Sequence, residues 1–262
     1  MKFGALIIGD EILSGRREDK HMSRVIAALG ARGLALSWAR YIGDEPERIV
    51  AELQAALAAG DTVFSFGGIG ATPDDHTRQC AARALGRPLA LHPEAAALIT
   101  QRATEMAAEK GLPAPDMSHP DQQRRLQMGV FPDTAQLIPN PYNRIPGFSV
   151  GHLHFMPGFP VMAHPMLDWV LDTQYADPAL RGTQAVRATR VRGTNESQLI
   201  PAFEHVEAAF AGVKIFSLPS VDHPVFGPHI EIGVKGGDEA QVAQAFALLL
   251  EQASQVGASI AQ

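Results

Sequence analysis

The sequence predicts an α/β protein built on a mostly parallel sheet with helices on both faces, followed by a small α+β subdomain. Short apolar runs that end in glycine, at residues 3–9 and 62–66, are typical of buried parallel strands. Helical patterns at 22–32 and 46–58 separate the runs, and strands that alternate with helices favour parallel pairing. After about residue 180 the pattern changes to strand, helix, strand, strand, helix, which indicates a second unit.

The first part of the chain predicts its elements in a regular order. Val25, Ile26 and Leu29 share one face of the first helix, and Pro46 opens the second. Prolines and glycines between 111 and 121 indicate a loop. The expected elements are strands at 3–9, 34–42, 62–66, 136–138 and 152–156, and helices at 22–32, 46–58, 76–85, 93–110 and 160–172.

A polar break at 174–184 separates the two parts of the chain. We therefore expect an α/β domain over residues 1–180 and a small α+β subdomain over residues 181–262. The elements expected in the subdomain are a strand at 185–191, a helix at 195–210, strands at 213–217 and 229–235, and a helix at 238–256.

Composition restricts the class of protein. With 262 residues, 46% hydrophobic, the chain can bury a core without disulfides or metals. Cys80 is the only cysteine, which favours a reducing compartment, and we expect a cytoplasmic protein. The apolar run at the N-terminus is short and is followed directly by Asp10 and Glu11, so it predicts a strand and not a signal peptide. No run of about eighteen apolar residues predicts a membrane span.

The charge distribution argues against nucleic acid as a partner. The formal net charge is −6, and no large cluster of lysines and arginines is present. Arg16, Arg17, Lys20 and Arg24 do form a short basic stretch. This stretch suits a small anionic ligand, or it is a solvated helix start.

The loop GGIGATPDD, residues 67–75, predicts an anion site. It follows a strand and precedes a helix, and Gly67, Gly68 and Gly70 let phosphate oxygens approach backbone N–H groups. Pro73 stands where a Rossmann motif needs glycine or alanine, and two aspartates replace the Lys-Ser/Thr of a P-loop. The loop is therefore of another type.

The two aspartates of this loop, Asp74 and Asp75, allow two interpretations. Carboxylates beside phosphates repel them unless a divalent metal bridges both groups, so the pair predicts a metal site. Alternatively, one of the aspartates caps the following helix.

Carboxylates also follow the first two strands. Asp10 and Glu11 come after the first strand, and Asp44 comes after the second. The ends of parallel strands meet at one edge of the sheet, so we expect these side chains to converge with Asp74 and Asp75. For Asp44 a helix cap before Pro46 is an equally good local interpretation.

Histidines and the cysteine carry less information. His152 and His154 are expected on one face of a strand, and a structural role is the better interpretation for both. The same holds for His164, His223 and His229, and Cys80 is expected to be a buried apolar residue.

Several segments together resemble a known family, the molybdopterin-binding (MoaB/Mog-like) fold. The segments are GDEILSG (9–15), IGDEPERI (42–49) and GGIGATPDDHT (67–77). The nearest branch is the N-terminal domain of competence/damage-inducible protein A (CinA), which is also attached to eukaryotic FAD synthase. Later segments are similar to the rest of this branch: NPYNRIPGF (140–148), LHFMPGFPVM (153–162) and GTNESQLIP (193–201).

The resemblance implies a three-layer αβα sandwich in a homo-oligomer, and a small phosphorylated ligand. That ligand would be a pterin such as molybdopterin, or a nucleotide diphosphate such as ADP-ribose or FAD. The implied activity is a nucleotide pyrophosphatase that needs Mg²⁺, Mn²⁺ or Co²⁺. Alternatives are adenylyl transfer in molybdenum-cofactor biosynthesis and a binding module without turnover.

The resemblance also assigns roles to residues. Asp75 takes the place of the loop aspartate that is essential in the family, and Asp44 that of the aspartate after the second strand, so both are expected to be catalytic. Together with the neighbouring Asp74 they are expected to hold the metal ion. The ligand-binding residues that the resemblance implies are Asp10, Glu11, Gly67, Gly68, Gly70, Thr72, Pro157 and Gly158.

The sequence departs from the family pattern at two places. It has Asp19-Lys20-His21 where Asp-Thr-Asn is usual, and Ala71 where proline is common. The nicotinamide-mononucleotide deamidase domain of full-length CinA is absent from this sequence, so that activity is not carried over.

Overall fold

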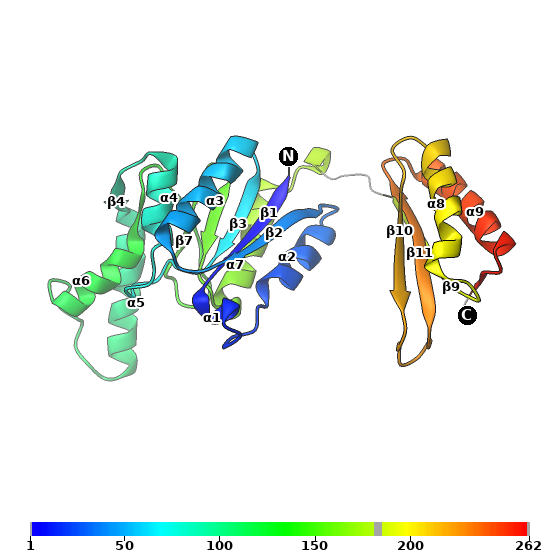
Figure 1. Cartoon of the computed structure of the whole chain (residues 1–262). Helices are drawn as coiled ribbons and strands as arrows, with labels where there is room; N and C mark the ends of the chain where they lie inside the picture. Colours follow the sequence, from blue (N-terminus) through cyan, green and yellow to red (C-terminus); the bar gives the residue numbers. More distant parts are fainter. Residues whose placement is uncertain (1, 181–184, 261–262) are drawn as a thin grey trace. The chain divides into compact units, whose positions relative to one another are not determined.

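The computed structural model describes residues 2–180 and 185–260. The chain divides into two compact units, Met1–Leu180 and Arg181–Gln262 (Figure 1). Each unit has its own sheet and its own apolar core, so each is described by itself.

The first unit is built on a six-stranded sheet. Pairing is parallel from β2 through β1 and β3 to β8, and antiparallel from β8 through β7 to β6. The predicted mostly parallel α/β sheet is therefore confirmed. In spatial order the strands are β2 (Leu36–Ile42), β1 (Phe3–Ile8), β3 (Thr62–Phe66), β8 (Leu153–Met156), β7 (Gly147–Val150) and β6 (Gln136–Ile138).

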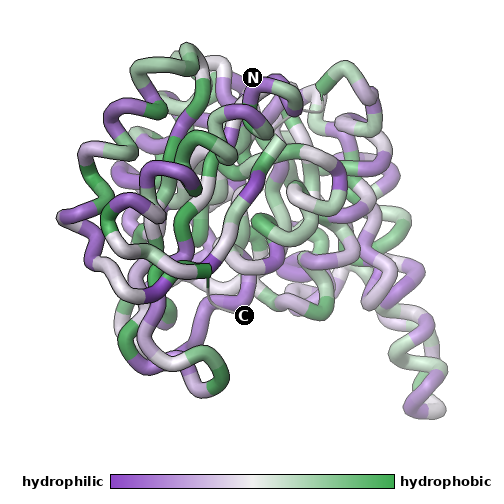
Figure 2. Tube along the Cα trace, turned by 90° about the vertical axis from the view of Figure 1, so that its right-hand side faces the viewer, coloured by the Kyte–Doolittle hydropathy of each residue, from purple (hydrophilic) through white to green (hydrophobic). Residues whose placement is uncertain are grey.

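Helices cover both faces of this sheet, which gives three layers (Figure 1). Side chains of β1 alternate between the two cores: Leu6 packs on the side of α3 and α4, and Ile7 on the side of α2 and α7. Hydrophilic and hydrophobic colours alternate along the helical turns in Figure 2, as one-sided burial of a helix requires. The helices are α1 (Asp10–Leu13), α2 (His21–Gly30), α3 (Pro46–Ala59), α4 (Thr77–Leu85), α5 (Pro93–Glu109), α6 (Pro120–Leu126) and α7 (Pro160–Gln174).

Several short elements were not predicted. α6 begins at Pro120, inside the last residues of the expected loop, and a small sheet pairs β4 (Leu89–Leu91) with β5 (Val130–Pro132). The short helices α1, η1 (Gln127–Gly129) and η2 (Pro178–Leu180) and the strand β7 were also missed. These elements have three or four residues or, in α6, a strongly polar sequence, so they carry no clear apolar period.

The histidines of the β7–β8 hairpin differ from the prediction in one respect. His152 is exposed and precedes β8, so it does not share a strand face with His154. His154 is buried and fully bonded, with Nδ1 2.8 Å from Ser149 Oγ and Nε2 2.7 Å from Tyr175 Oη. Burial lowers the pKa of His154 to about 3, so the ring is neutral.

Cys80 lies on α4 and is buried, as predicted. Its Sγ is 3.5 Å from the Pro46 carbonyl oxygen, and burial raises the pKa of the thiol to about 11. The residue fills space between α3 and α4 as a small apolar group.

The second unit is a four-stranded antiparallel sheet with two helices; the first three strands and both helices follow the predicted order, and the fourth strand, β12, was not predicted. Asn195 caps α8 and forms a capping box with Gln198. Among the described residues, none of the helices combines the length and apolar character needed to cross a membrane. The elements are β9 (Ala185–Arg192), α8 (Glu196–Ala209), β10 (Lys214–Ser220), β11 (His229–Gly236), α9 (Glu239–Gln255) and β12 (Ser259–Ile260), with the strands ordered β10-β11-β9-β12.

Candidate functional site

The carboxyl ends of β1 and β2 are joined by two aspartates. The Asp10 N–H donates to Asp44 Oδ2 at 3.0 Å, and the Asp44 N–H donates to Asp10 Oδ1 at 3.3 Å. The convergence expected for this pair is therefore present. Asp44 does not cap α3, because Glu45 occupies the N-cap position and makes no side-chain cap bond.

A cleft of about 360 Å³ opens at this edge of the sheet. It brings together the ends of β1, β2 and β3 with the segment after β8. Every predicted site residue lines it except Asp10, which reaches it only through Asp44. The lining residues are Ile8, Gly9, Glu11, Arg17, Asp44, Gly67, Gly68, Ile69, Gly70, Ala71, Thr72, Asp74, Asp75, Pro157, Gly158 and Phe159.

The glycine loop needs its glycines for geometric reasons. Gly67 has φ 104° and Gly68 has φ 66°, a region that side chains disfavour. A Cβ at Gly68 would overlap the hydroxyl of Thr77, which donates to the Gly67 carbonyl at 3.0 Å. Within residues 2–180, the backbone N–H groups of residues 68–71 meet no protein acceptor. Consecutive unpaired N–H groups at a cleft are suited to bind an anion.

Asp75 holds the loop and does not cap the helix. Its Oδ2 accepts the Thr72 N–H at 2.8 Å and also the Thr72 hydroxyl. His76 is the N-cap residue of α4 and makes no side-chain cap bond, so the interpretation of Asp74 or Asp75 as a cap was wrong. The Thr72 N–H is consequently occupied, unlike those of residues 68–71.

The acidic side chains of the cleft influence one another. Burial raises the pKa of Asp44, and the negative charges of Asp10, Glu11 and Asp74 raise it further, while the hydrogen bond from the Asp10 N–H opposes the change. Arg17 is the cation on the cleft wall, with Nη1 3.6 Å from Glu11 Oε1 and its guanidinium 5.3 Å from the Phe159 ring centroid. A cation placed near Asp44 would relieve the repulsion.

Arg78 supports the glycine loop, a role that the sequence analysis did not predict. The side chain is buried, and its Nη2 donates to the Gly70 carbonyl at 2.6 Å. Burial lowers the pKa of this guanidinium, an effect that the charge of Asp75 opposes. An arginine at the second position of a helix ordinarily faces solvent, so its burial depends on the fold of the loop above it.

His21 holds the opposite wall of the cleft. Its ring stacks on Phe66 at 4.5 Å, and its Nε2–H donates to the Gly158 carbonyl at 3.2 Å. Burial lowers the pKa of His21, which favours the neutral ring. His21 Nδ1 and the neighbouring His164 Nε2 are buried without a partner in the described part of the chain.

The carboxylates fit a divalent ion only together with a ligand. Among the described residues, no group of three or more His, Cys, Asp or Glu side chains could hold a metal ion. Mg²⁺, however, is commonly held by one or two carboxylates together with substrate phosphates and water. Asp44 and Asp74, close enough to repel, provide such a partial set.

An apolar slot of about 170 Å³ adjoins the cleft. The two share Ile69, Gly70, Pro157 and Phe159. The rest of its lining combines apolar side chains with two amides: Met128, Asn140, Asn143, Ile145, Pro146 and Met162. Its size and lining suit part of a flat ring with polar edges.

The chain is similar to known proteins. Residues 4–181 match the family described as "Probable molybdopterin binding domain". A CinA-like protein of Geotalea daltonii is 32% identical over 219 residues, which cover 82% of this chain and 50% of the relative. A protein of Caldivirga maquilingensis is 28% identical over 92% of this chain and 91% of its own length.

A solved structure shows the same fold. The CinA protein of Thermoplasma acidophilum, described as of unknown function, matches with a TM-score of 0.55 and 26% identity. The match covers 66% of this chain and 98% of that protein. This chain spans about half the length of two curated CinA-like relatives, 51% of the protein of Syntrophotalea carbinolica and 50% of that of Geotalea daltonii.

Proposed function

This chain belongs to the family of probable molybdopterin-binding domains, in the CinA-like branch, and from that premise we propose a metal-dependent nucleotide pyrophosphatase. The proposed substrate is a nucleotide diphosphate of the ADP-ribose or FAD kind. The observation that carries the proposal is the row of unpaired N–H groups at residues 68–71 beside the carboxylates of Asp44 and Asp74.

In this proposal the loop binds the diphosphate. The N–H groups of residues 68–71 donate to phosphoryl oxygens, and the buried guanidinium of Arg78 adds positive charge beneath them. Asp75 keeps the loop in its shape through Thr72. The apolar slot beside Ile69 takes the ring of the ligand.

Asp44, Asp74 and Asp75 would hold Mg²⁺, Mn²⁺ or Co²⁺ once phosphate oxygens complete the coordination. When bound, such an ion neutralises the diphosphate and lowers the pKa of a water ligand. Arg17 lies on the wall of the cleft and pairs with Glu11, which reduces the repulsion between the acidic wall and the incoming anion.

The test follows AMP release from ADP-ribose, FAD, NADH and ATP with each of the three metal ions. We expect metal-dependent release that is lost in Asp44→Asn and kept in Asp121→Asn, a control in the remote helix α6. Saturable nucleotide binding without release in any combination would support a binding module instead. Transfer of AMP to a pterin acceptor, without free AMP, would support an adenylyltransferase.

A further inference from the structure

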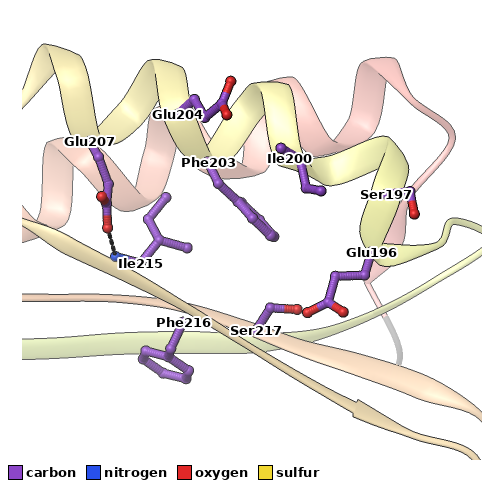
Figure 3. Close-up of a pocket in the computed structure, with 9 residues that line it drawn as sticks. All are labelled: Glu196, Ser197, Ile200, Phe203, Glu204, Glu207, Ile215, Phe216 and Ser217. Carbon is purple, nitrogen blue, oxygen red and sulfur yellow. Dashed lines mark hydrogen bonds between the residues drawn. The ribbon is translucent and has the colours of Figure 1, made fainter.

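The second unit has a groove of about 460 Å³ that shares no residue with the cleft. It lies between α8 and the strand β10, and Figure 3 shows both walls. The ring of Phe216 lies on the far side of the strand from α8 (Figure 3). The lining residues are Glu196, Ser197, Ile200, Phe203, Glu204, Glu207, Ile215, Phe216 and Ser217.

One wall of the groove is the edge of a sheet. β10 is an outer strand, paired on one side with β11. The Ile215 N–H donates to Glu207 Oε1 at 2.9 Å, so it points away from β11. Alternate residues of a strand direct their backbone groups to the same side. The backbone of Ser217 therefore also points toward the groove, whereas Pro219 offers a carbonyl and no N–H.

This edge admits a short guest strand and resists a long one. Glu207 and Pro219 block it on either side of Ser217, which limits backbone pairing to a few groups. The Ser217 hydroxyl is buried and has no partner in the described part of the chain. Because backbone pairing is limited to a few groups, side-chain contacts with α8 must supply most of the specificity for the guest strand.

The other wall is a stripe of α8 with a regular pattern. Glu196, Ile200 and Glu204 are four residues apart, so they share one helix face. Ile200 is 46% exposed, and Phe203 lies beside it in the groove. Neither Glu196 nor Glu204 has an ion-pair partner in residues 185–260, whereas Glu207 pairs with Lys214 at 3.3 Å. The open part of the groove is therefore acidic with an apolar centre.

The spacing of this stripe matches an extended peptide. Glu204 follows Glu196 by eight positions on the helix, a rise of about 12 Å. In an extended strand, residues i and i+4 face the same side about 13 Å apart, with residue i+2 between them. We propose that the groove binds an extended segment of a partner protein with the pattern basic-x-apolar-x-basic. The basic side chains face Glu196 and Glu204, and the apolar side chain contacts Ile200.

A second copy of this chain fits the groove less well. The strand that it would contribute, Lys214–Ser220, contains a single basic residue, and that residue is already paired. Two such grooves would also place their acidic walls together.

The experiment measures fluorescence polarisation of a labelled peptide, Gly-Lys-Thr-Val-Thr-Lys-Gly, titrated with the full chain. The control peptide, Gly-Val-Lys-Lys-Thr-Thr-Gly, has the same composition without the spacing. We expect saturable binding of the first peptide, and about a tenfold loss of affinity in the double variant Glu196→Gln/Glu204→Gln. The matched variant Glu251→Gln, an exposed glutamate of α9, should bind normally.

Three results would overturn the proposal. They are no saturable binding at millimolar protein, equal binding of the two peptides, and unchanged affinity in the double variant. Self-association that Ile200→Asp abolishes would assign the groove to a second copy and would also overturn it. Circular dichroism of each variant verifies that it folds.

Discussion

Replacing Gly68 by alanine tests why the loop needs glycine at this position. Glycine is needed because the Thr77 hydroxyl lies where a Cβ would be, or only because the backbone is left-handed there. Gly68 has φ 66°, and an alanine there bears about 1–2 kcal/mol of backbone strain. Its Cβ would also overlap the Thr77 hydroxyl, which donates to the Gly67 carbonyl in the buried interior. Losing that bond and leaving the carbonyl unpaired costs a further ~1–3 kcal/mol.

Gly151 provides a matched control. It lies in the turn between β7 and β8, has φ 58°, and has open space within 4 Å of the position of an added Cβ. The variant Gly151→Ala therefore bears the backbone strain alone, about 1–2 kcal/mol. The difference between the two variants isolates the contact with Thr77 and should be about 1–3 kcal/mol.

Thermal and urea unfolding of the full chain measure this difference. In a unit of about this size, 1 kcal/mol lowers Tm by roughly 2–4 °C, so Gly68→Ala should unfold several degrees below Gly151→Ala. Gly68→Ala should also weaken phosphate binding, because it displaces the N–H groups of residues 68–71, while Gly151→Ala should not. Equal unfolding free energies for the two variants would show that the contact of the added Cβ with Thr77 has no measurable cost.

Further predictions concern the carboxylates, pH and the boundary between the units. Asp75→Asn keeps an acceptor for the Thr72 N–H, so the free energy of unfolding should fall by only roughly 0.5–1 kcal/mol. AMP release and metal affinity should fall as well. Normal turnover would remove Asp75 from the mechanism. The folded pKa of His154, about 3, lies below its unfolded value of 6.5, so its contribution to stability is complete above pH 6.5 and is lost as pH falls toward 3. That loss is at most ~5 kcal/mol, and urea unfolding at several pH values should show a smaller pH dependence for His154→Gln; an unchanged dependence contradicts the assignment. A chain ending at Leu180 should fold, as circular dichroism would show, and an insoluble product would count against the boundary.

Much of the fold could be predicted because it depends on short-range pattern. Alternation of apolar runs with helical periods identified β1, α2, β2, α3 and β3 in order. Parallel pairing then required the strand ends to meet, which is why Asp10 and Asp44 were expected together before any distance was known. The positions of Asp10 and Asp44 could be predicted because each follows directly from the direction of the strand before it.

The rest depended on loop conformation, which no local pattern encodes. Asp75 was interpreted as a cap or a metal ligand, and its bond to the Thr72 N–H, which closes the loop, was not predicted. Arg78 is buried because the Gly70 carbonyl lies above it. His21 reaches Gly158, which is 137 residues away in the sequence. The first two contacts depend on the conformation of the loop, and the third joins segments that meet only after the sheet has formed.

The buried state of Cys80 has a practical consequence for spectroscopy. With a thiol pKa of about 11, roughly one molecule in ten thousand carries the reactive thiolate at pH 7, and the side chain is closed to reagents. Cysteines introduced at exposed positions, such as Gln54→Cys on α3 and Gln244→Cys on α9, would therefore react with maleimide dyes while Cys80 stays unlabelled. The natural thiol need not be mutated, and a donor–acceptor pair placed on the two units would report their separation with and without ligand.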